Sequence, residues 1–442
     1  SRLNDVVYFN PADTAYPLGF NPLEVTNPNQ KTNISSEVIG VLKRMFGESW
    51  GPRLEYILRY TILALLDRPE TTMLDITRML TDKNFRKETL GYCRDTVVLQ
   101  FWNVEFASWN DKFVAEAVAP VLNKVGAFTA NPIIRNIIGQ PKSTFNIRQI
   151  MDEGRILIVN LSKGLIGEDN AAILGSFLVT KIQLAAMSRS DIPDIRDRRP
   201  FYLYVDEFQN FATDSFATIL SEARKYGLNL TVANQYISQM NETVRDAVFG
   251  NVGTMISFRV SADDAPILAK QFEPNFEAVD LLQMHNRNFV INMVIGGEKT
   301  PAFSARTLEL PPSQADNTPH IIEHSRRMYS RSREDVEREI TAAIMPNHRP
   351  KNQPAQPRPQ AVAAAALAQP VKKAASQPAQ KTNTAANAQP TTPQTTTNSG
   401  EVILQIRGNN TLDKPADSTN PAAATTPKKR RRRRKKSTAI TT

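Results

Sequence analysis

The chain has 442 residues, with 54 Lys and Arg against 44 Asp and Glu, a net charge of +10. Residues 348–442 hold 17 basic and 3 acidic residues, so the preceding part has a net charge of −4, which excludes a uniformly basic DNA-coating protein. The single cysteine, Cys93, excludes an intrachain disulfide and a cysteine metal cluster, and no uninterrupted apolar run reaches the ~18 residues that a membrane span needs.

The first predicted element is a buried strand at residues 6–9, Val-Val-Tyr-Phe, followed at 10–23 by a loop rich in Pro, Asn and Gly. Because the chain starts with serine and nothing leads into this strand, we expect the sequence to be the C-terminal part of a longer protein. From 31 to 145 apolar residues recur at helical spacing, as in Leu54, Ile57 and Leu58. This pattern predicts an all-helical insertion.

From residue 146 short apolar runs alternate with helical segments, which is typical of a mainly parallel α/β sheet. The predicted strands lie at 155–161, 201–205, 228–233, 254–260 and 288–295, and the two clearest helices at about 169–187 and 216–225. Residues 1–30 and 146–325 are therefore expected to form one α/β domain that residues 31–145 interrupt. A C-terminal helix is expected at 326–347.

The last segment, 348–442, is rich in Pro, Ala, Thr and Gln and contains no Phe, Tyr or Trp. Such a segment cannot bury enough apolar surface to offset its chain entropy, so we predict a disordered tail. It ends in nine consecutive basic residues, namely Lys428, Lys429, Arg430, Arg431, Arg432, Arg433, Arg434, Lys435 and Lys436. This run is suited to binding DNA phosphates, to docking on an anionic membrane, or only to keeping the chain soluble.

The most informative motif is Phe-Tyr-Leu-Tyr-Val at 201–205, which runs directly into Asp206 and Glu207. In nucleotide-hydrolysing sheets a buried strand delivers such a pair to the edge where ligands bind, an arrangement called Walker B. Asp206 would hold the water shell of Mg²⁺, and Glu207 would polarise the attacking water. The plain alternative is a strand that ends in an exposed acidic turn, which is common.

Two further residues fit the same chemistry. The next predicted strand ends in Asn234 and Gln235, which would place a neutral amide at the same edge if the two strands are neighbours. Gln235 would then sense the terminal phosphate, or else only cap a loop. Arg224 lies at the border of an apolar helical face, where it could neutralise phosphate charge across a subunit boundary or form an ordinary surface salt bridge.

A phosphate-binding loop of the form Gly-x-x-x-x-Gly-Lys-Ser/Thr does not occur in the 442 residues. Gly-Gly-Glu-Lys-Thr at 296–300 follows a strand but lacks the spacing, and it places Glu where phosphate would bind. We therefore expect either that the loop lies upstream of Ser1 or that the protein is not a working ATPase.

Three runs together resemble the C-terminal half of the type IV secretion and conjugation coupling ATPases, which belong with the HerA/FtsK-like DNA-pumping motors. The runs are Tyr-Leu-Tyr-Val-Asp-Glu-Phe at 202–208, Leu-Ser-Glu-Ala-Arg-Lys-Tyr-Gly at 220–227 and Thr-Val-Ala-Asn-Gln-Tyr at 231–236. The sequence at 250–260 and the opening loop fit the same family. The resemblance implies a RecA-like α/β fold in which residues 31–145 are the family's helical insertion.

The resemblance also implies roles for individual residues. Asp206 would be the Mg²⁺-linked acid, Glu207 the catalytic base, Gln235 the sensor and Arg224 the arginine that acts between subunits. Arg259 would be a second basic residue near the nucleotide or a neighbouring subunit. ATP and Mg²⁺ would be the cofactors, DNA the partner and a homo-oligomer, usually a hexameric ring, the assembly. The tail could bind secretion-channel proteins or an anionic membrane. A segment upstream would hold the motor at the inner face of the bacterial cell membrane.

Two other interpretations stay open. A non-hydrolysing DNA-binding or scaffold protein would keep the sheet and lack the phosphate loop. Asp-Glu-Phe-Gln at 206–209 also resembles the second motif of superfamily 1 helicases, but the Gly-Asp-x-x-Gln element and the aromatic motifs of those enzymes are missing from this sequence.

Overall fold

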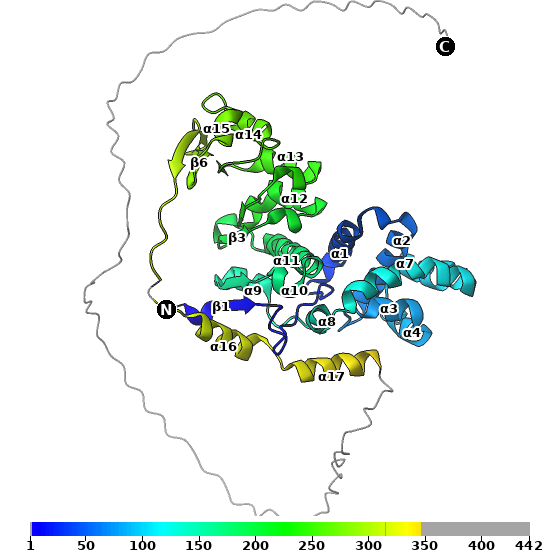
Figure 1. Ribbon diagram of the computed structural model, residues 1–442. Coiled ribbons are helices and arrows are strands. Elements are labelled where there is room, and N and C mark those ends of the chain that lie inside the picture. Colours follow the sequence, from blue (N-terminus) through cyan, green and yellow to red (C-terminus); the bar gives the residue numbers. More distant parts are fainter. Residues whose placement is uncertain (1, 314, 346–442) are drawn as a thin grey trace, which may run out of the picture. The chain divides into compact units, whose positions relative to one another are not determined.

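The computed structural model describes residues 2–313 and 315–345 of the chain (Figure 1). The tail predicted over 348–442, with its basic run, lies outside the described residues. One hydrophobic core extends through the helices of the first half and both pairs of parallel strands. A smaller core lies beneath a separate antiparallel sheet.

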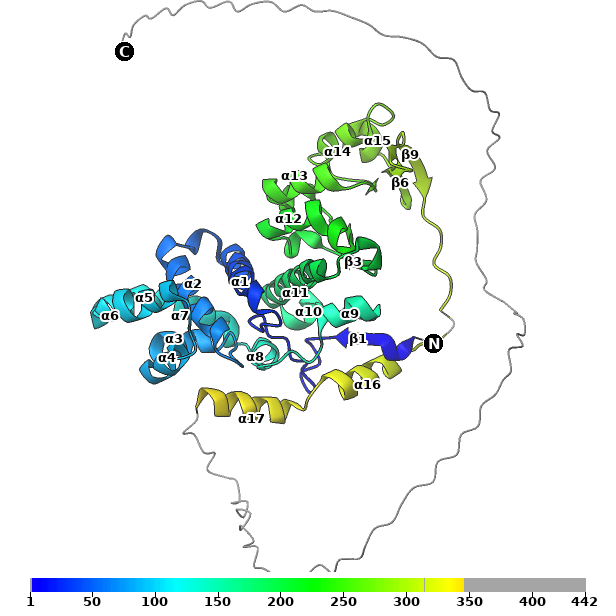
Figure 2. The ribbon, with the colours of Figure 1, turned by 180° about the vertical axis from the view of Figure 1, so that it is seen from behind.

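The first parallel pair joins the two ends of the helical insertion. Strand β1 (Val6–Phe9) pairs with β2 (Ile156–Val159), so Val6 lies opposite Ile156 although 150 positions separate them in the sequence. Helix α16 (Thr318–Tyr329) lies beside β1 in both views (Figures 1 and 2), and the Tyr8 N–H donates to the Ser325 hydroxyl at 3.0 Å. Segments from both ends and the middle of the described chain therefore meet here.

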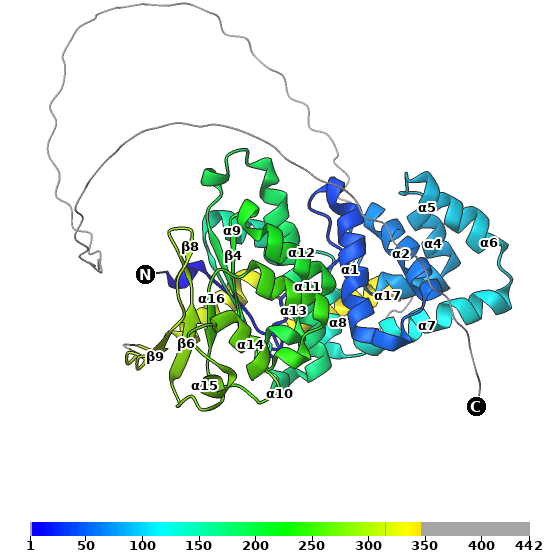
Figure 3. The ribbon, with the colours of Figure 1, turned by 90° about the horizontal axis from the view of Figure 1, so that it is seen from above.

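Between these strands the described residues from 31 to 145 form helices and connecting turns but no strand, as the sequence predicts. Polar caps begin several of them, because Asp82, Asp95, Asn110 and Asn131 each accept a backbone N–H of the first turn. The helices are α1 (Lys31–Phe46), α2 (Pro52–Asp67), α3 (Asp75–Thr81), α4 (Lys83–Leu90), α5 (Thr96–Gln100), α6 (Phe106–Ser108), α7 (Asp111–Thr129) and α8 (Pro132–Ile138), followed by α9 (Ile147–Glu153). Figure 3 shows α2, α4, α5, α6 and α7 beside the α/β part.

The second parallel pair consists of β3 (Phe201–Val205) and β4 (Leu228–Val232). Before it come α10 (Lys163–Ile166) and α11 (Glu168–Ser188), and between the strands lie α12 (Asp214–Glu222) and the 3₁₀ turn η8 (Ala223–Tyr226). The segment Glu168–Asp191, which contains α11, is long and apolar enough to cross a membrane by length and composition. However, 72% of its most apolar window is buried in the fold, which is the packing of a core helix.

The prediction of a mainly parallel sheet is wrong for the strands after residue 250. Strand β5 (Met255–Ser257) is antiparallel to β6 (Asn288–Asn292), and β6 is antiparallel to β9 (Phe303–Arg306). Helix α13 (Glu242–Asn251) precedes β5, and two helices, α14 (Ala265–Phe272) and α15 (Ala278–Leu282), separate β5 from β6. In a parallel connection, one crossover helix returns the chain to the end of the sheet where the first strand began. Here a second helix carries the chain back again, so β6 begins at the end of the sheet where β5 finishes and runs antiparallel to it.

A hairpin explains the second antiparallel connection. Strands β7 (Val294–Ile295) and β8 (Glu298–Lys299) pair through a turn at Gly296 and Gly297, whose φ angles are 61° and 93°. Positive φ at both central residues is the geometry of a tight hairpin turn, which glycine adopts without steric cost. The Gly-Gly-Glu-Lys-Thr sequence is therefore a hairpin, in agreement with the expectation that it is no phosphate loop.

The single C-terminal helix expected at 326–347 is instead two helices, α16 and α17 (Arg333–Ile344). The break has a local cause, because Ser330 is extended and the Ser332 hydroxyl accepts the Asp335 N–H at 3.2 Å, which caps a new helix. The first of the two begins at Thr318, eight residues before the predicted start.

Candidate functional site

The residues predicted to carry chemistry lie where β3 and β4 end. Val205 pairs with Val232, and the ladder continues beyond both strands because Ala233 N–H donates to Val205 O and Phe208 N–H donates to Ala233 O, each at 2.9 Å. The two strands are thus neighbours, which is the condition for Gln235 to reach the acidic pair. We call residues 206–210, which follow β3, the acidic turn.

Glu207 is held in an unusual conformation between two amides. Its φ of 51° lies in the left-handed region, which costs a non-glycine residue on the order of 1–3 kcal/mol. Its Oε1 accepts a hydrogen bond from Gln235 Nε2 at 2.5 Å, and its Oε2 accepts one from Gln209 Nε2 at 2.6 Å. Backbone strain that the surroundings maintain is common at functional sites, so this geometry supports a functional role for the Glu207 carboxylate.

Asp206 is exposed at the strand end, and its Oδ1 accepts the Glu207 N–H at 2.9 Å. Among the described residues no group of three or more His, Cys, Asp or Glu side chains could hold a metal ion. One or two carboxylates nevertheless suit Mg²⁺, which keeps several waters and takes further oxygen ligands from phosphates. The donor set at the acidic turn therefore fits a water-linked Mg²⁺ ion.

An open cavity of about 600 Å³ adjoins the acidic turn. Its lining includes Glu207 and Gln235 together with residues that the sequence interpretation missed, namely Lys163, Glu168, Gln209, Asn210 and Gln239. Lys163 opens the short helix α10, four residues after β2 ends, so its position soon after a predicted strand is a signal that the sequence offers. Its Nζ is 3.0 Å from Glu168 Oε1. Lys163 is the one cation among the described residues that line this cavity, and it lies at the same edge as Glu207.

The two arginines do not join this cavity within one chain. Arg224 is exposed in η8, just before β4 begins, whereas Gln235 lies just after β4 ends. Five strand residues at ~3.3 Å each place Arg224 at the opposite end of the strand, roughly 16 Å away. Arg259 is exposed two residues after β5, in the antiparallel sheet. Any role for either arginine at Glu207 would have to come from a neighbouring subunit.

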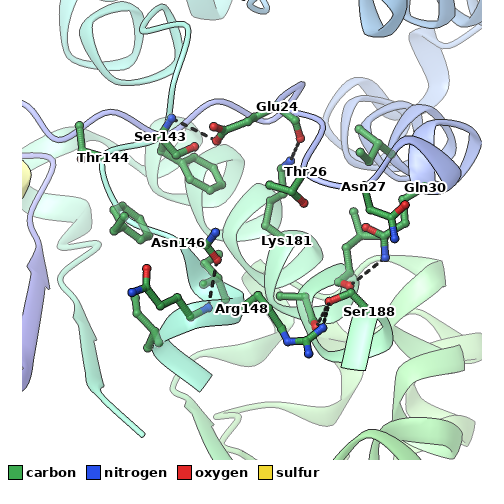
Figure 4. A pocket seen from close by; sticks show the side chains of 18 of the residues that line it. Glu24, Thr26, Asn27, Gln30, Ser143, Thr144, Asn146, Arg148, Lys181 and Ser188 are labelled. Carbon is green, nitrogen blue, oxygen red and sulfur yellow. Dashed lines mark hydrogen bonds between the residues drawn. The ribbon is translucent and has the colours of Figure 1, made fainter. Parts of the chain in front are cut away.

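A second cavity, of about 560 Å³, lies beside the C-terminal half of α11 (Figure 4). Its groups are largely occupied with one another: Lys181 donates to the Glu24 carbonyl at 2.8 Å, and the Glu24 carboxylate accepts the Ser143 N–H at 3.1 Å (Figure 4). Burial lowers the pKa of Lys181 to about 8. Because these contacts tie the loop after β1 to α11, we interpret this cavity as a structural junction.

Comparisons with known proteins bear on the family. Residues 200–271 match the family model described as the TraM recognition site of TraD and TraG. The unbound monoclinic form of the bacterial conjugative coupling protein TrwBdeltaN70 is similar in structure, with a TM-score of 0.51 and 14% identity over 70% of this chain and 74% of that chain. Its trigonal form in complex with sulphate gives a TM-score of 0.50 and 14% identity over 68% and 74% of the two chains. No curated protein matches the sequence.

At this level of identity the structural similarity shows the fold, a RecA-like α/β arrangement with a helical domain, and the matched segment covers β3, β4 and the acidic turn between them. Residues 200–271 match the family model of the TraD and TraG recognition site, and the fold is similar to that of a conjugative coupling protein, so the predicted resemblance to the TraG/TraD-like coupling proteins is confirmed.

Proposed function

We propose that this protein is an ATP-driven motor that couples nucleotide hydrolysis to the movement of DNA in conjugation or type IV secretion. The observation that carries the proposal is the Glu207 carboxylate, which two amides hold beside Asp206 at the carboxyl edge of β3 and β4. The segment that matches the TraD and TraG family contains all of these residues.

In this proposal Glu207 takes a proton from the water that attacks the terminal phosphorus of ATP. The bond from that phosphorus to the bridging oxygen breaks, and ADP and phosphate leave. Asp206 would hold Mg²⁺ through water, and the ion would neutralise charge on the phosphate oxygens. Gln235, whose amide already reaches Glu207, would exchange that contact for one to the terminal phosphate or to the attacking water.

The phosphate loop would come from polypeptide outside residues 1–442. The sheet geometry supports this part of the proposal, because among the described strands β2 pairs only with β1 and β3 only with β4. Alternate residues of the two strands are also exposed, with exposed fractions of 43% for Ile158 and 71% for Tyr204. Parallel strands are normally covered on both faces by crossover helices, so a further strand at a free edge, with its connecting helix over the exposed face, would complete this sheet.

The proposal extends to the assembly. Arg224 and Arg259, which do not reach Glu207 within one chain, would act across subunit boundaries in a homo-oligomeric ring, which we propose to be hexameric with DNA in its channel. The region 200–271 would contact a partner protein, as the TraM recognition site of TraD and TraG does by its description. The motor would work at the inner face of the bacterial membrane and contact secretion-channel proteins.

A non-hydrolysing DNA-binding or scaffold protein remains the second candidate, because the sequence contains no Gly-x-x-x-x-Gly-Lys-Ser/Thr. The deciding experiment measures phosphate release by the protein expressed from its complete reading frame, with and without DNA and with and without Mg²⁺. We expect hydrolysis that requires Mg²⁺ and rises when DNA is added. DNA binding without phosphate release would reject the motor and favour the scaffold.

We also propose that the basic run Lys428–Lys436, outside the described residues, binds DNA phosphates. Removing nine cations should reduce the slope of log K against log salt by up to about 8 for duplex DNA, because each neutralised phosphate contributes ~0.9. A deletion of residues 418–426, which are nine uncharged residues of the same tail, is the matched control. An unchanged slope, combined with lost binding to vesicles that contain anionic lipid, would assign the run to membranes instead.

A further inference from the structure

A side chain of the helical insertion contacts the acidic turn. Arg44, which is exposed on α1, donates from Nη2 to the backbone carbonyl of Gln209 at 2.5 Å. Helix α1 packs beside α11 and α12, so Arg44 reaches the acidic turn from an element that is itself anchored to the α/β core. The helical insertion and the turn that carries Glu207 are therefore in direct contact.

Gln209 connects the Arg44 contact to the Glu207 carboxylate. It is only 9% exposed, and its backbone N–H donates to Asn234 Oδ1 at 3.1 Å. Its side-chain amide donates to Glu207 Oε2 at 2.6 Å, while its buried Oε1 has no hydrogen-bond partner among the described residues. A buried amide that leaves one atom unsatisfied costs free energy, so the bond to Glu207 is what holds this side chain in place.

The two amides that hold Glu207 differ in exposure. Both line the cavity, but Gln235 is exposed there, whereas Gln209 is largely buried. In the proposed reaction Gln235 would turn toward the nucleotide and release Glu207 Oε1 to accept a proton, while Gln209 would continue to hold Oε2. Gln209 would then be the contact that keeps the carboxylate oriented.

We propose that Gln209 is a positioning residue for Glu207 and that Arg44 fixes Gln209 from the helical insertion, so that the position of α1 sets the orientation of the base. This proposal rests on the proposed nucleotide hydrolysis at Glu207 and adds its regulation. A movement of the helical insertion would change turnover through Gln209, without any contact between the insertion and the nucleotide.

The test compares Gln209→Leu, Gln209→Met and Arg44→Met in the protein expressed from its complete reading frame. We expect kcat to fall about 10-fold or more in each, because small displacements of a catalytic group are costly, with the nucleotide Kd and the melting temperature near those of the wild type. Gln149→Leu is the matched control, since Gln149 also donates to a glutamate, Glu153, at 2.6 Å, but on α9. Lys43→Met controls for a lost cation on α1.

A double variant distinguishes an effect of Arg44 that passes through Gln209, which we call the relay, from two independent effects on kcat. If Arg44 acts through Gln209, Arg44→Met combined with Gln209→Leu should lower kcat no further than the stronger single variant. A double loss equal to the product of the single losses would overturn the relay. An unchanged kcat, or a change in KM alone, would overturn the positioning role while wild-type hydrolysis stands. Should the Gln209 variants not fold, unchanged turnover in Arg44→Met still contradicts the proposal, and a wild type that releases no phosphate contradicts the proposed function itself.

Discussion

Replacing Glu207 with glutamine should stop nucleotide turnover while leaving the nucleotide bound. The amide has almost the shape of the carboxylate but cannot accept the proton of the attacking water, and general-base catalysis contributes ~10²–10⁴-fold to such reactions. The structure adds a second effect, because both oxygens of Glu207 accept amide N–H groups, at 2.5 and 2.6 Å. A glutamine presents only one acceptor to those two donors, so the side chain would also lose its orientation.

The measurement is phosphate release under conditions of nucleotide saturation, together with nucleotide retention on the same preparation. Glu88→Gln is the control, since Glu88 is an exposed, ion-paired glutamate 3.4 Å from Arg68 in the helical insertion. We expect the control to turn over at the wild-type rate and Glu207→Gln to be at least 100-fold slower. Hydrolysis that persists unchanged in Glu207→Gln would show that another group is the base.

Local patterns were sufficient to predict the elements that build the site. The run Phe201–Val205 is apolar and lies between Pro200 and Asp206, so its pattern predicts a strand with the bounds that the structure shows. The same reasoning predicts the strand at Val6–Phe9 and helix α11, because each has a composition that fits a single structure. The edge where Asp206, Glu207 and Gln235 meet follows from two adjacent parallel strands.

Features that depend on long-range contacts could not be predicted in this way. The direction of β6 is decided by two intervening helices and that of β9 by a hairpin, and an apolar run has the same pattern whether it pairs parallel or antiparallel. Arg44 meets Gln209 across 165 positions of sequence, and Gln209 itself looks like an ordinary polar residue after a Walker B strand. The resemblance to coupling ATPases implies roles for individual residues, but it indicates neither the contact of Arg44 with Gln209 nor that of Gln209 with Glu207.

Replacing Arg189 with methionine should destabilise the protein by about 3 kcal/mol or more, because the buried guanidinium donates to two carbonyls and each hydrogen bond to a charged group contributes ~1.5–3 kcal/mol. The Arg189 side chain is fully buried and lies at the end of α11. It donates to the carbonyls of Tyr226 at 3.1 Å and Arg199 at 2.5 Å, and its Nε is 3.2 Å from Asp152 Oδ1. Burial lowers the pKa of this guanidinium, but an arginine stays charged, so its partners are needed to compensate the charge.

Methionine fills much of the same volume, so the expected loss comes mainly from the Tyr226 and Arg199 carbonyls, which lose a charged donor, and from the lost ion pair with Asp152. Urea unfolding monitored by circular dichroism gives the change in the free energy of unfolding. Arg196→Met is the control, because Arg196 has an exposed fraction of 86% and a surface pair with Asp194 worth ~0–1 kcal/mol. Equal stability of the two variants would contradict the structural role of Arg189.

The position of Arg189 also connects stability with the candidate site. Arg199 directly precedes the segment that enters β3, and Tyr226 precedes β4, so one guanidinium fastens the amino ends of both strands. Those ends set the register in which Phe201 lies opposite Leu228, and the same register brings Glu207 to Gln235 at the other end of the pair. A variant at Arg189 that still folds should therefore lose turnover as well as stability, although the residue lies at the opposite end of the strands from Glu207.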